Sequence, residues 1–281
     1  MNLFTLEHRL FIPHPALADF VSGILVFRAD LRSMPNEVIN PFPPTPEQYL
    51  YFYLADPVAT RKQDESFFSE KPGTMIVGAQ LSRVDLNMGK NHSMLAVIFR
   101  PGGLYRLLGG LPMMELTDAD YDSSLLLGSG MTRIREQLQH ASSWDQSKAI
   151  VESWLLSRLP KVKTLSPFDH AMRAAMQSGG LLPVEQLASI ACTSIRQFER
   201  QCLTRIGMGP KILSRITRFS TAYRLFERRP DMTWISIAHS TGYFDQMHLV
   251  RDFKQFAGMV PTLLQSSLLH TPLRLQAGIR E

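Results

Sequence analysis

The sequence predicts a two-domain α+β protein, in which a strand-rich N-terminal domain with helices precedes an all-α C-terminal domain. Two observations carry this prediction: a change of charge along the chain, and a repeated helical pattern confined to the last third. Residues 160–281 carry 16 Lys and Arg against 8 Asp and Glu, a net of +8, whereas residues 1–159 carry 14 against 17, a net of −3. A basic half beside a mildly acidic half indicates that only the C-terminal half meets a polyanion.

The composition is that of a soluble globular protein. The 281 residues, 44% hydrophobic and 20% charged, are enough for two domains with separate cores. No apolar run approaches the ~18–20 residues that cross a bilayer, and residues 1–11 lack a secretory pattern, so we expect a cytoplasmic protein without membrane contact. Cys192 and Cys202 imply no disulfide framework, and each is expected to be a small buried side chain.

Short strands separated by turns predict a small barrel or sandwich over residues 1–128. The expected strands are Gln48–Leu54, Met75–Val77, Val84–Leu86 and Met94–Phe99, and Pro41–Pro46 is expected to be a loop. Tyr49, Tyr51 and Tyr53 alternate with apolar residues and therefore share one face of the first of these strands. That face either packs in the core of a sheet or lines a pocket, and we expect packing.

Two amphipathic helices are predicted after the strands, at Gly130–Ala141 and Gln146–Leu159. The apolar stripes of these helices must be buried against another surface. The barrel and a partner subunit are both open, and the partner subunit is preferred. Earlier in the chain, the Gly102-Gly103 pair is expected to be a strand-to-helix turn and not a phosphate-binding loop. The predicted division is therefore an N-terminal domain at 1–159, a linker at 160–167, a helical domain at 168–266 and a tail at 267–281.

The last third of the chain contains an internal repeat. Six pairs of identical or similar residues are separated by 51 positions: Arg200 and Arg251, Gly207 and Gly258, Met208 and Met259, Pro210 and Pro261, Phe198 and Leu249, and Cys202 and Phe253. Upstream the separation becomes 50, as for Ala188 and Ala238. An ordered set of this size indicates two related supersecondary units that differ by one residue in the turn.

Each unit is predicted to be a helix, a tight turn and a second helix. The units span about 184–205 and 234–256, and a single helix at about 211–229 connects them and ends before Pro230. Ser194 is the expected N-cap of the second helix in the first unit. The side chains expected to be buried in the second helix of each unit are Ile195, Phe198 and Cys202, and then Leu249, Phe253 and Phe256.

With this pattern, residues 182–264 resemble the DNA-binding domain of the AraC/XylS family of bacterial transcription regulators. The segments that carry the resemblance are Gly242-Tyr243-Phe244-Asp245-Gln246-Met247-His248-Leu249-Val250-Arg251-Asp252-Phe253-Lys254 and Gly258-Met259-Val260-Pro261, with Leu187-Ala188, Ser194, Phe198, Arg200, Gly207 and Pro210 in the first unit. Three residues depart from the family pattern. Cys192 stands where the family usually has Gly, Cys202 where it has Phe, and Phe244 where it has a Ser-type cap that Asp245 can replace.

The resemblance implies two helix-turn-helix units whose recognition helices lie on one side of a duplex, about one turn or ~34 Å apart. Base contacts are then predicted for residues near the N-terminal end and outward stripe of each recognition helix: Arg196, Gln197, Glu199 and Arg200, and Gln246, Met247, Val250 and Arg251. Phosphate contacts are predicted for Ser194, Lys211, Arg215, Arg218 and Lys254. For Arg200 and Arg251, a phosphate contact or a bracing role inside the unit remains an alternative.

The predicted function is that of a sequence-specific transcription regulator, with activation expected and repression left open. Family members commonly carry a cupin-like barrel for effector binding and dimerisation, so a small molecule, a second copy and RNA polymerase are candidate partners besides duplex DNA. An adaptor controlled by a protein partner is the main alternative. A fused enzyme is disfavoured, because the N-terminal half has no His-x-His pair, no Ser-centred elbow and no Walker-type loop. We therefore expect no catalytic residue, no metal and no cofactor.

Overall fold

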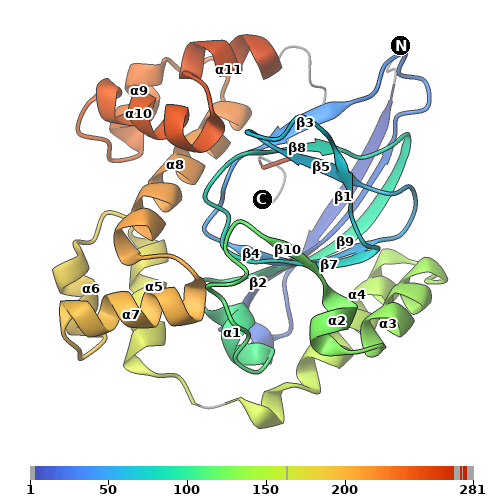
Figure 1. Ribbon diagram of the computed structural model, residues 1–281, viewed down its shortest axis with the longest axis horizontal. Helices are drawn as coiled ribbons and strands as arrows, with labels where there is room; N and C mark the ends of the chain where they lie inside the picture. Colours follow the sequence, from blue (N-terminus) through green and yellow to red (C-terminus); the bar gives the residue numbers. More distant parts are fainter. Residues whose placement is uncertain (1–3, 163, 269–272, 274, 277–281) are drawn as a thin grey trace.

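The computed structural model describes residues 4–162, 164–268, 273, 275 and 276. Its N-terminal part consists of two β-sheets packed face to face, and its C-terminal part is a column of helices beside them (Figure 1). The predicted two-domain α+β class is thus confirmed. The predicted domain boundaries stay predictions, and most of the predicted tail, 267–281, lies outside the described residues.

All strand pairs in the two sheets are antiparallel. The first sheet has the order β1-β2-β9-β4-β7-β10, with β1 (Thr5–Phe11), β2 (Val21–Asp30), β4 (Gln48–Tyr53), β7 (Thr74–Val77), β9 (Asn91–Phe99) and β10 (Asp120–Asp122). The second has the order β3-β8-β5-β6, with β3 (Ile39–Phe42), β5 (Ala59–Lys62), β6 (Ser69–Glu70) and β8 (Val84–Asn87). The four strands expected from the sequence are present, each within three residues of its expected ends.

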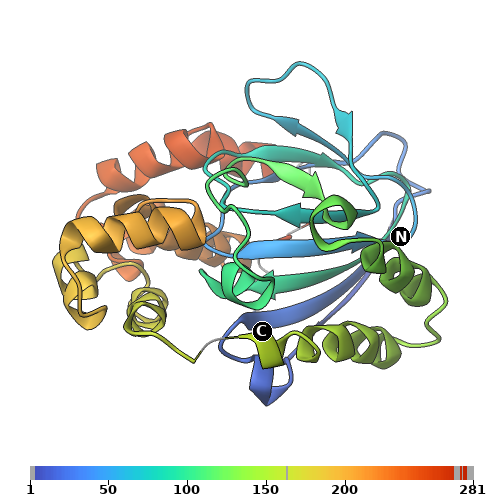
Figure 2. The same ribbon diagram turned by 60° about the horizontal axis from the view of Figure 1, so that its bottom comes forward.

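Alternation along β4 separates two hydrophobic clusters. Leu50 and Phe52 face the outside of the six-stranded sheet, where they join apolar side chains of α3 (Gly130–Gln139) and α4 (Trp144–Leu156). The tyrosines of β4 face the four-stranded sheet instead. Figure 2 shows the green helices against the larger sheet. The barrel therefore buries the apolar stripes of α3 and α4, which removes the reason to prefer a partner subunit there, and dimerisation stays a prediction.

The structure differs from the sequence expectations at Pro41 and in the number of strands. Pro41 lies in β3 and not in a loop, because β3 is an edge strand of its sheet, where a residue without an N–H is tolerated. Six strands in the described part of the chain were not predicted, namely β1, β3, β5, β6, β10 and the ten-residue strand β2. The last of these, β2, shows why. Most of its residues are buried, since helices cover one face of the sheet and the second sheet covers the other, so the chain shows no alternation of polar and apolar residues.

The Gly102-Gly103 pair is a strand-to-helix turn, as predicted. Gly102 has a φ of 83° and is the N-cap of α1 (Gly103–Leu107), three residues after the end of β9. At Gly103 a Cβ atom would collide with the backbone carbonyl of Phe20, so the close approach of two chain segments requires glycine there. The remaining short elements of this part are α2 (Ser123–Leu127) and the 3₁₀ turns Pro15–Leu17 and Leu159–Lys161.

The helical domain contains α5 (Pro167–Gln177), α6 (Val184–Ile190), α7 (Ile195–Ile206), α8 (Pro210–Arg228), α9 (Trp234–Ser240), α10 (Gln246–Ala257) and α11 (Pro261–Leu268). Helices α6 and α7 form the first helix-turn-helix unit, α9 and α10 form the second, and α8 runs between them (Figure 1). The predicted helices agree with these bounds to within one or two residues, whereas α5 and α11 were not predicted. No helix in the described part of the chain is long and apolar enough to span a membrane.

Two expectations about burial in the first unit are wrong. Ile195 is 43% exposed, and the buried stripe of α7 is Phe198, Cys202 and Ile206. The reason is that Ile195 is the first residue of its helix, where no preceding turn of helix lies over the core. Cys192 is exposed and not buried, because it occupies the turn with a left-handed φ of 51°.

Candidate nucleic-acid interface and barrel cavity

The two recognition helices present polar side chains at their N-terminal ends. In α7, Ser194 caps the helix by accepting a hydrogen bond from the backbone N–H of Gln197 at 3.3 Å, and Arg196, Gln197 and Arg200 are exposed while Glu199 is half-buried. In α10, Asp245 caps the helix in the same way, accepting from the N–H of His248 at 2.8 Å. The outward residues of α10 are Gln246, Met247 and Arg251, which are exposed, and Val250, which is half-buried. Asp245 thus replaces the missing Ser-type cap, as the sequence suggested.

The repeated arginines are not engaged with the protein. Neither Arg200 nor Arg251 has a hydrogen bond or ion pair to any residue within the described ranges, and both are exposed. A bracing role inside the unit would require such partners. Both guanidinium groups are thus exposed at the surface of their helices.

The predicted phosphate contacts fall into two groups. Lys211 on α8 and Lys254 on α10 are exposed, with no side-chain partner among the described residues. Arg215 is instead held by the protein, with Nη2 at 2.6 Å from both Asp252 Oδ1 and Gln255 Oε1. The guanidinium of Arg218 lies 5.6 Å from the ring centre of Tyr243.

A polar network ties the turn of the second unit to α8. The buried carboxylate of Asp252 accepts a hydrogen bond from the Tyr243 hydroxyl at 3.0 Å while it pairs with Arg215. Burial raises the pKa of Tyr243 well above its usual value, and the neighbouring Asp252 carboxylate adds to the effect, so the hydroxyl stays a donor. The network fixes the start of α10 relative to α8.

One candidate contact residue was missed in the sequence analysis. Phe244 directly precedes the cap of α10 and is 91% exposed, with its ring centre 6.2 Å from that of His248. An exposed aromatic side chain at the tip of a recognition helix has no structural role in the unit. The sequence did contain a sign of this candidate contact, because Phe244 departs from the family pattern. We interpreted that departure only as the loss of an N-cap.

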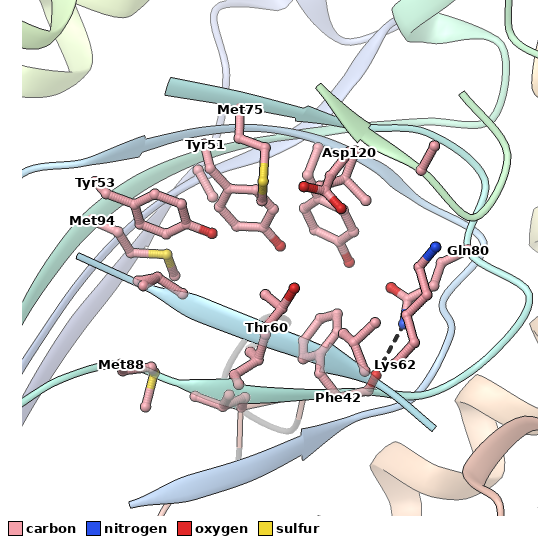
Figure 3. Close-up of a pocket in the computed structure, with 18 of the residues that line it drawn as sticks. Phe42, Tyr51, Tyr53, Thr60, Lys62, Met75, Gln80, Met88, Met94 and Asp120 are labelled. Atoms are coloured by element: carbon pink, nitrogen blue, oxygen red, sulfur yellow. Dashed lines mark hydrogen bonds between the residues drawn. The ribbon is translucent and has the colours of Figure 1, made fainter. Parts of the chain in front are cut away.

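A cavity lies between the two sheets of the N-terminal domain. Its volume is about 100 Å³, somewhat less than the roughly 150 Å³ cavity that holds benzene in a protein core. Its walls are mostly apolar and include Met75, Met88 and Met94, with Lys62 and Gln80 at one end (Figure 3). We had expected the tyrosine face of β4 to pack in a core, and this is wrong in part because Tyr49, Tyr51 and Tyr53 stack on each other along the cavity wall.

The polar groups that line the cavity include tyrosine hydroxyls and His92, beside the charged side chains of Lys62, Asp118 and Asp120. Figure 3 shows the hydroxyls of Tyr51 and Tyr53 directed into the cavity, and neither has a hydrogen-bond partner in the described part of the chain. Burial raises the pKa of both hydroxyls far above their usual range. Burial also lowers the pKa of His92 to about 4, and its Nδ1 atom has no partner among the described residues. These groups remain available for a ligand. Within the described residues, no group of three potential metal ligands is present.

Two family models match parts of the chain. Residues 187–267 match a family model described as a helix-turn-helix domain, and residues 9–122 match a domain of unknown function, DUF6597. No curated protein matches the chain in sequence. Among solved structures, ToxT from Vibrio cholerae is 11% identical with a TM-score of 0.48, covering 96% of this chain and 99% of ToxT.

Two further structures show similar coverage. Unsaturated fatty acid bound ToxT from Vibrio cholerae is 10% identical over 93% of this chain and 94% of that one, with a TM-score of 0.47. The AraC-like transcriptional activator CuxR is 12% identical over 97% and 88%, with a TM-score of 0.20. Similarity at this level does not transfer what those proteins bind. The matched helix-turn-helix model and the two observed units together show that the C-terminal part of the chain is an AraC-type helix-turn-helix domain and that the protein is a DNA-binding regulator of transcription.

Proposed function

We propose that the protein reads a specific DNA sequence with α7 and α10, inserted in successive major grooves of one duplex. The observation that carries this proposal is the pair of repeat-equivalent helices whose N-terminal ends are polar, capped and exposed. Arginine suits guanine, glutamine suits adenine, and apolar side chains suit the methyl group of thymine. The base-reading residues are those predicted from the sequence: Arg196, Gln197, Glu199, Arg200, Gln246, Met247, Val250 and Arg251.

Phosphate contacts would fix the register of the two helices on the duplex without reading it. Lys211, Lys254 and the Ser194 hydroxyl remain available for this role, and Arg215 and Arg218 keep it as a proposal despite their contacts in the protein. Phe244 joins the interface as an apolar contact to a sugar or a thymine methyl beside α10, because its ring is almost fully exposed.

We also propose that the cavity binds a small, mostly apolar effector that carries an acceptor oxygen. Two unpartnered tyrosine hydroxyls in an apolar wall are suited to such an oxygen, and a ligand that left them unpaired would lose affinity. An adaptor controlled by a protein partner would not need this cavity. RNA polymerase and a second copy of the chain remain candidate partners.

The DNA-reading proposal is tested by selecting duplexes from a random library with the full chain and measuring affinities for the selected and a scrambled site across a salt series. Gln246→Ala should weaken the selected site by about 1–3 kcal/mol and leave scrambled DNA nearly unchanged. Lys211→Ala should weaken both and reduce the salt slope by about one. Arg133→Ala, an exposed arginine on α3, is the matched control and should change neither. Equal losses on both DNAs for Gln246→Ala would show that this residue does not read bases.

The effector proposal is tested by thermal melting of the full chain with phenol, indole, hexanol and hexanoate. An occupant should raise the melting temperature by mass action. Ala96→Leu, which adds side-chain volume to the cavity wall, should abolish that rise, whereas Ala149→Leu on α4, remote from the cavity, should retain it. If the rise is the same in both variants, the compound binds elsewhere.

A further inference from the structure

The barrel holds the two recognition helices at equivalent points. The carbonyl of Ile206, at the end of α7, accepts a hydrogen bond from Gln48 Nε2 at 2.9 Å, and the next carbonyl, of Gly207, accepts one from Thr117 Oγ1 at 2.7 Å. The carbonyl of Ala257, at the end of α10, accepts one from Arg83 Nη1 at 3.1 Å. Ile206 and Ala257 are 51 positions apart, which is the period of the repeat.

These hydrogen bonds are made to carbonyl groups at the C-terminal ends of the two helices, where acceptors are unpaired. The last carbonyls of a helix have no partner within it, so side chains that donate to them fix the position of the helix end. The hydrogen bond from Gln48 to Ile206 is buried, and the bonds from Thr117 and Arg83 are partly buried. At Gly207 a Cβ atom would lie 2.5 Å from the Met113 carbonyl, so the barrel and the first unit meet at backbone contact.

Because the barrel contacts only the C-terminal ends of α7 and α10 in these hydrogen bonds, the N-terminal ends remain accessible to DNA. In the major groove, the N-terminal residues of a recognition helix contact the bases, and the distance between two such helices sets the spacing of the two half-sites. Both N-terminal ends are exposed in this structure, and both C-terminal ends are hydrogen-bonded to side chains of the N-terminal domain. The attachment therefore constrains spacing and does not block reading.

The segments that hold the helices also line the cavity. Gln48 precedes the cavity-lining Tyr49, Arg83 lies between the lining residues Ser82 and Val84, and Thr117 precedes the lining residue Asp118. The last two segments are joined, since Asp118 Oδ1 accepts hydrogen bonds from the N–H groups of Leu81 at 2.6 Å and Ser82 at 3.3 Å. A ligand that moves this wall would move the contact points of both helices.

We propose that Gln48, Arg83 and Thr117 are positioning residues for DNA recognition: they set the relative placement of α7 and α10 and thereby the half-site spacing that the protein accepts. The inference rests on the proposed reading of DNA by these two helices. It assigns to the N-terminal domain a part in target selection even in the absence of an effector.

The experiment uses the full chain and the selected duplex, with one or two base pairs inserted or removed between the half-sites. We expect the wild-type protein to lose at least tenfold in affinity when the spacing changes by two base pairs. Arg83→Ala and the nearly isosteric Thr117→Val should reduce this discrimination to threefold or less, and Thr117→Ser should restore it. Arg61→Ala is the matched control, because Arg61 pairs with Asp85 at 2.9 Å, as Arg83 does at 3.1 Å, but has no contact with the helical domain among the described residues.

Two results would overturn the inference. The first is a wild-type protein that binds all spacings alike. The second is a loss of affinity in Arg83→Ala and Thr117→Val that is the same at every spacing, which is what a merely structural role would give. Melting curves identify a variant that fails to fold, and Thr117→Val, the smaller change, then decides. If selection recovers no preferred sequence with the wild-type chain, the proposed function itself fails, which is a different outcome from a site bound without spacing preference.

Discussion

The two helix-turn-helix units share one backbone plan but are stabilised from different sources. The second unit has an aromatic core, in which the ring centre of Phe253 lies 4.9 Å from that of Phe219 and 5.1 Å from that of Trp234. The first unit has Cys202 at the position of Phe253. Its aromatic packing comes from α5, whose Phe168 ring centre lies 5.7 Å from that of Phe198, and Gly207 at the end of α7 meets the barrel backbone.

Two copies of one helix-turn-helix module can therefore keep the same backbone plan while different contacts stabilise them. The second unit is tied to α8 by aromatic rings and by the network around Asp252, and it contacts the barrel through the hydrogen bond from Arg83 to the Ala257 carbonyl. The first unit has the closer backbone contact with the barrel, at Gly207, so we expect a disturbance of the barrel to reach the first unit before the second. Regulation by the N-terminal domain would then act unequally on the two recognition helices.

The largest expected effect comes from removing the aromatic core. Phe253→Ala should destabilise the protein by about 3–5 kcal/mol, because a large cavity replaces a fully buried ring. Cys202→Ala should cost only about 1 kcal/mol, since far fewer atoms leave the core. Urea unfolding of the full chain, with hydrogen exchange to locate the opened helices, measures both. Similar costs for the two substitutions would mean that the first core is as tightly packed as the second.

The two C-terminal glycines of the recognition helices give the next test. Gly207 and Gly258 both have a left-handed φ, of 90° and 73°, which an alanine adopts at a cost of about 1–2 kcal/mol. Gly207→Ala also forces apart two backbones, which adds about 1–3 kcal/mol. At Gly258 the neighbouring atoms belong to the flexible end of Gln63. We therefore expect Gly207→Ala to be about 2 kcal/mol more costly than Gly258→Ala by thermal or urea unfolding, and equal costs would contradict the tight docking of the first unit.

The contrast between the units was only partly predictable from the sequence. The repeat, the caps and the apolar periodicity are local signals, and they predicted α6 to α10 to within two residues. The docking of Gly207 on the barrel is not local, because it joins residues that are 94 positions apart (Met113 and Gly207) and leaves no pattern in either segment. Likewise, the tyrosine stripe of β4 showed which side chains share a face, but the cavity beside them depends on how far the second sheet lies from the first.

Acidification should lower the stability of the barrel more than that of the second helix-turn-helix unit. Folding keeps His92 neutral with a pKa of about 4, whereas the unfolded chain binds its proton at about 6.5. The unfolded state therefore binds more protons below pH 6.5, and stability falls as the pH drops from 6.5 toward 4. Between pH 7 and pH 5 this one residue should remove roughly 2 kcal/mol.

The measurement is hydrogen exchange at both pH values, corrected for intrinsic rates and compared with His92→Gln, which should lose this part of the pH dependence. Protection should decrease in the barrel and next in α7, and least in α10, whose unit contains only the exposed histidines His239 and His248. A uniform loss across both units would show that the first unit does not depend on the barrel more than the second.

The smallest expected effect concerns the turns of the two units. Cys192 and Gly242 occupy equivalent turns with left-handed φ values of 51° and 73°. Cys192→Gly should stabilise the protein by about 0.5–1 kcal/mol, because the relief of about 1–2 kcal/mol of backbone strain exceeds the extra entropy of glycine in the unfolded chain. Gly242→Ala should destabilise it, both through that strain and because its Cβ would lie 2.5 Å from Leu181 Cδ2. Thermal melting of the two variants, with exposed Cys192→Ser to control for loss of the thiol, tests the pair. If Cys192→Gly lowers the melting temperature while Cys192→Ser does not, the left-handed turn of the first unit is not strained, and the two units differ less than their sequences imply.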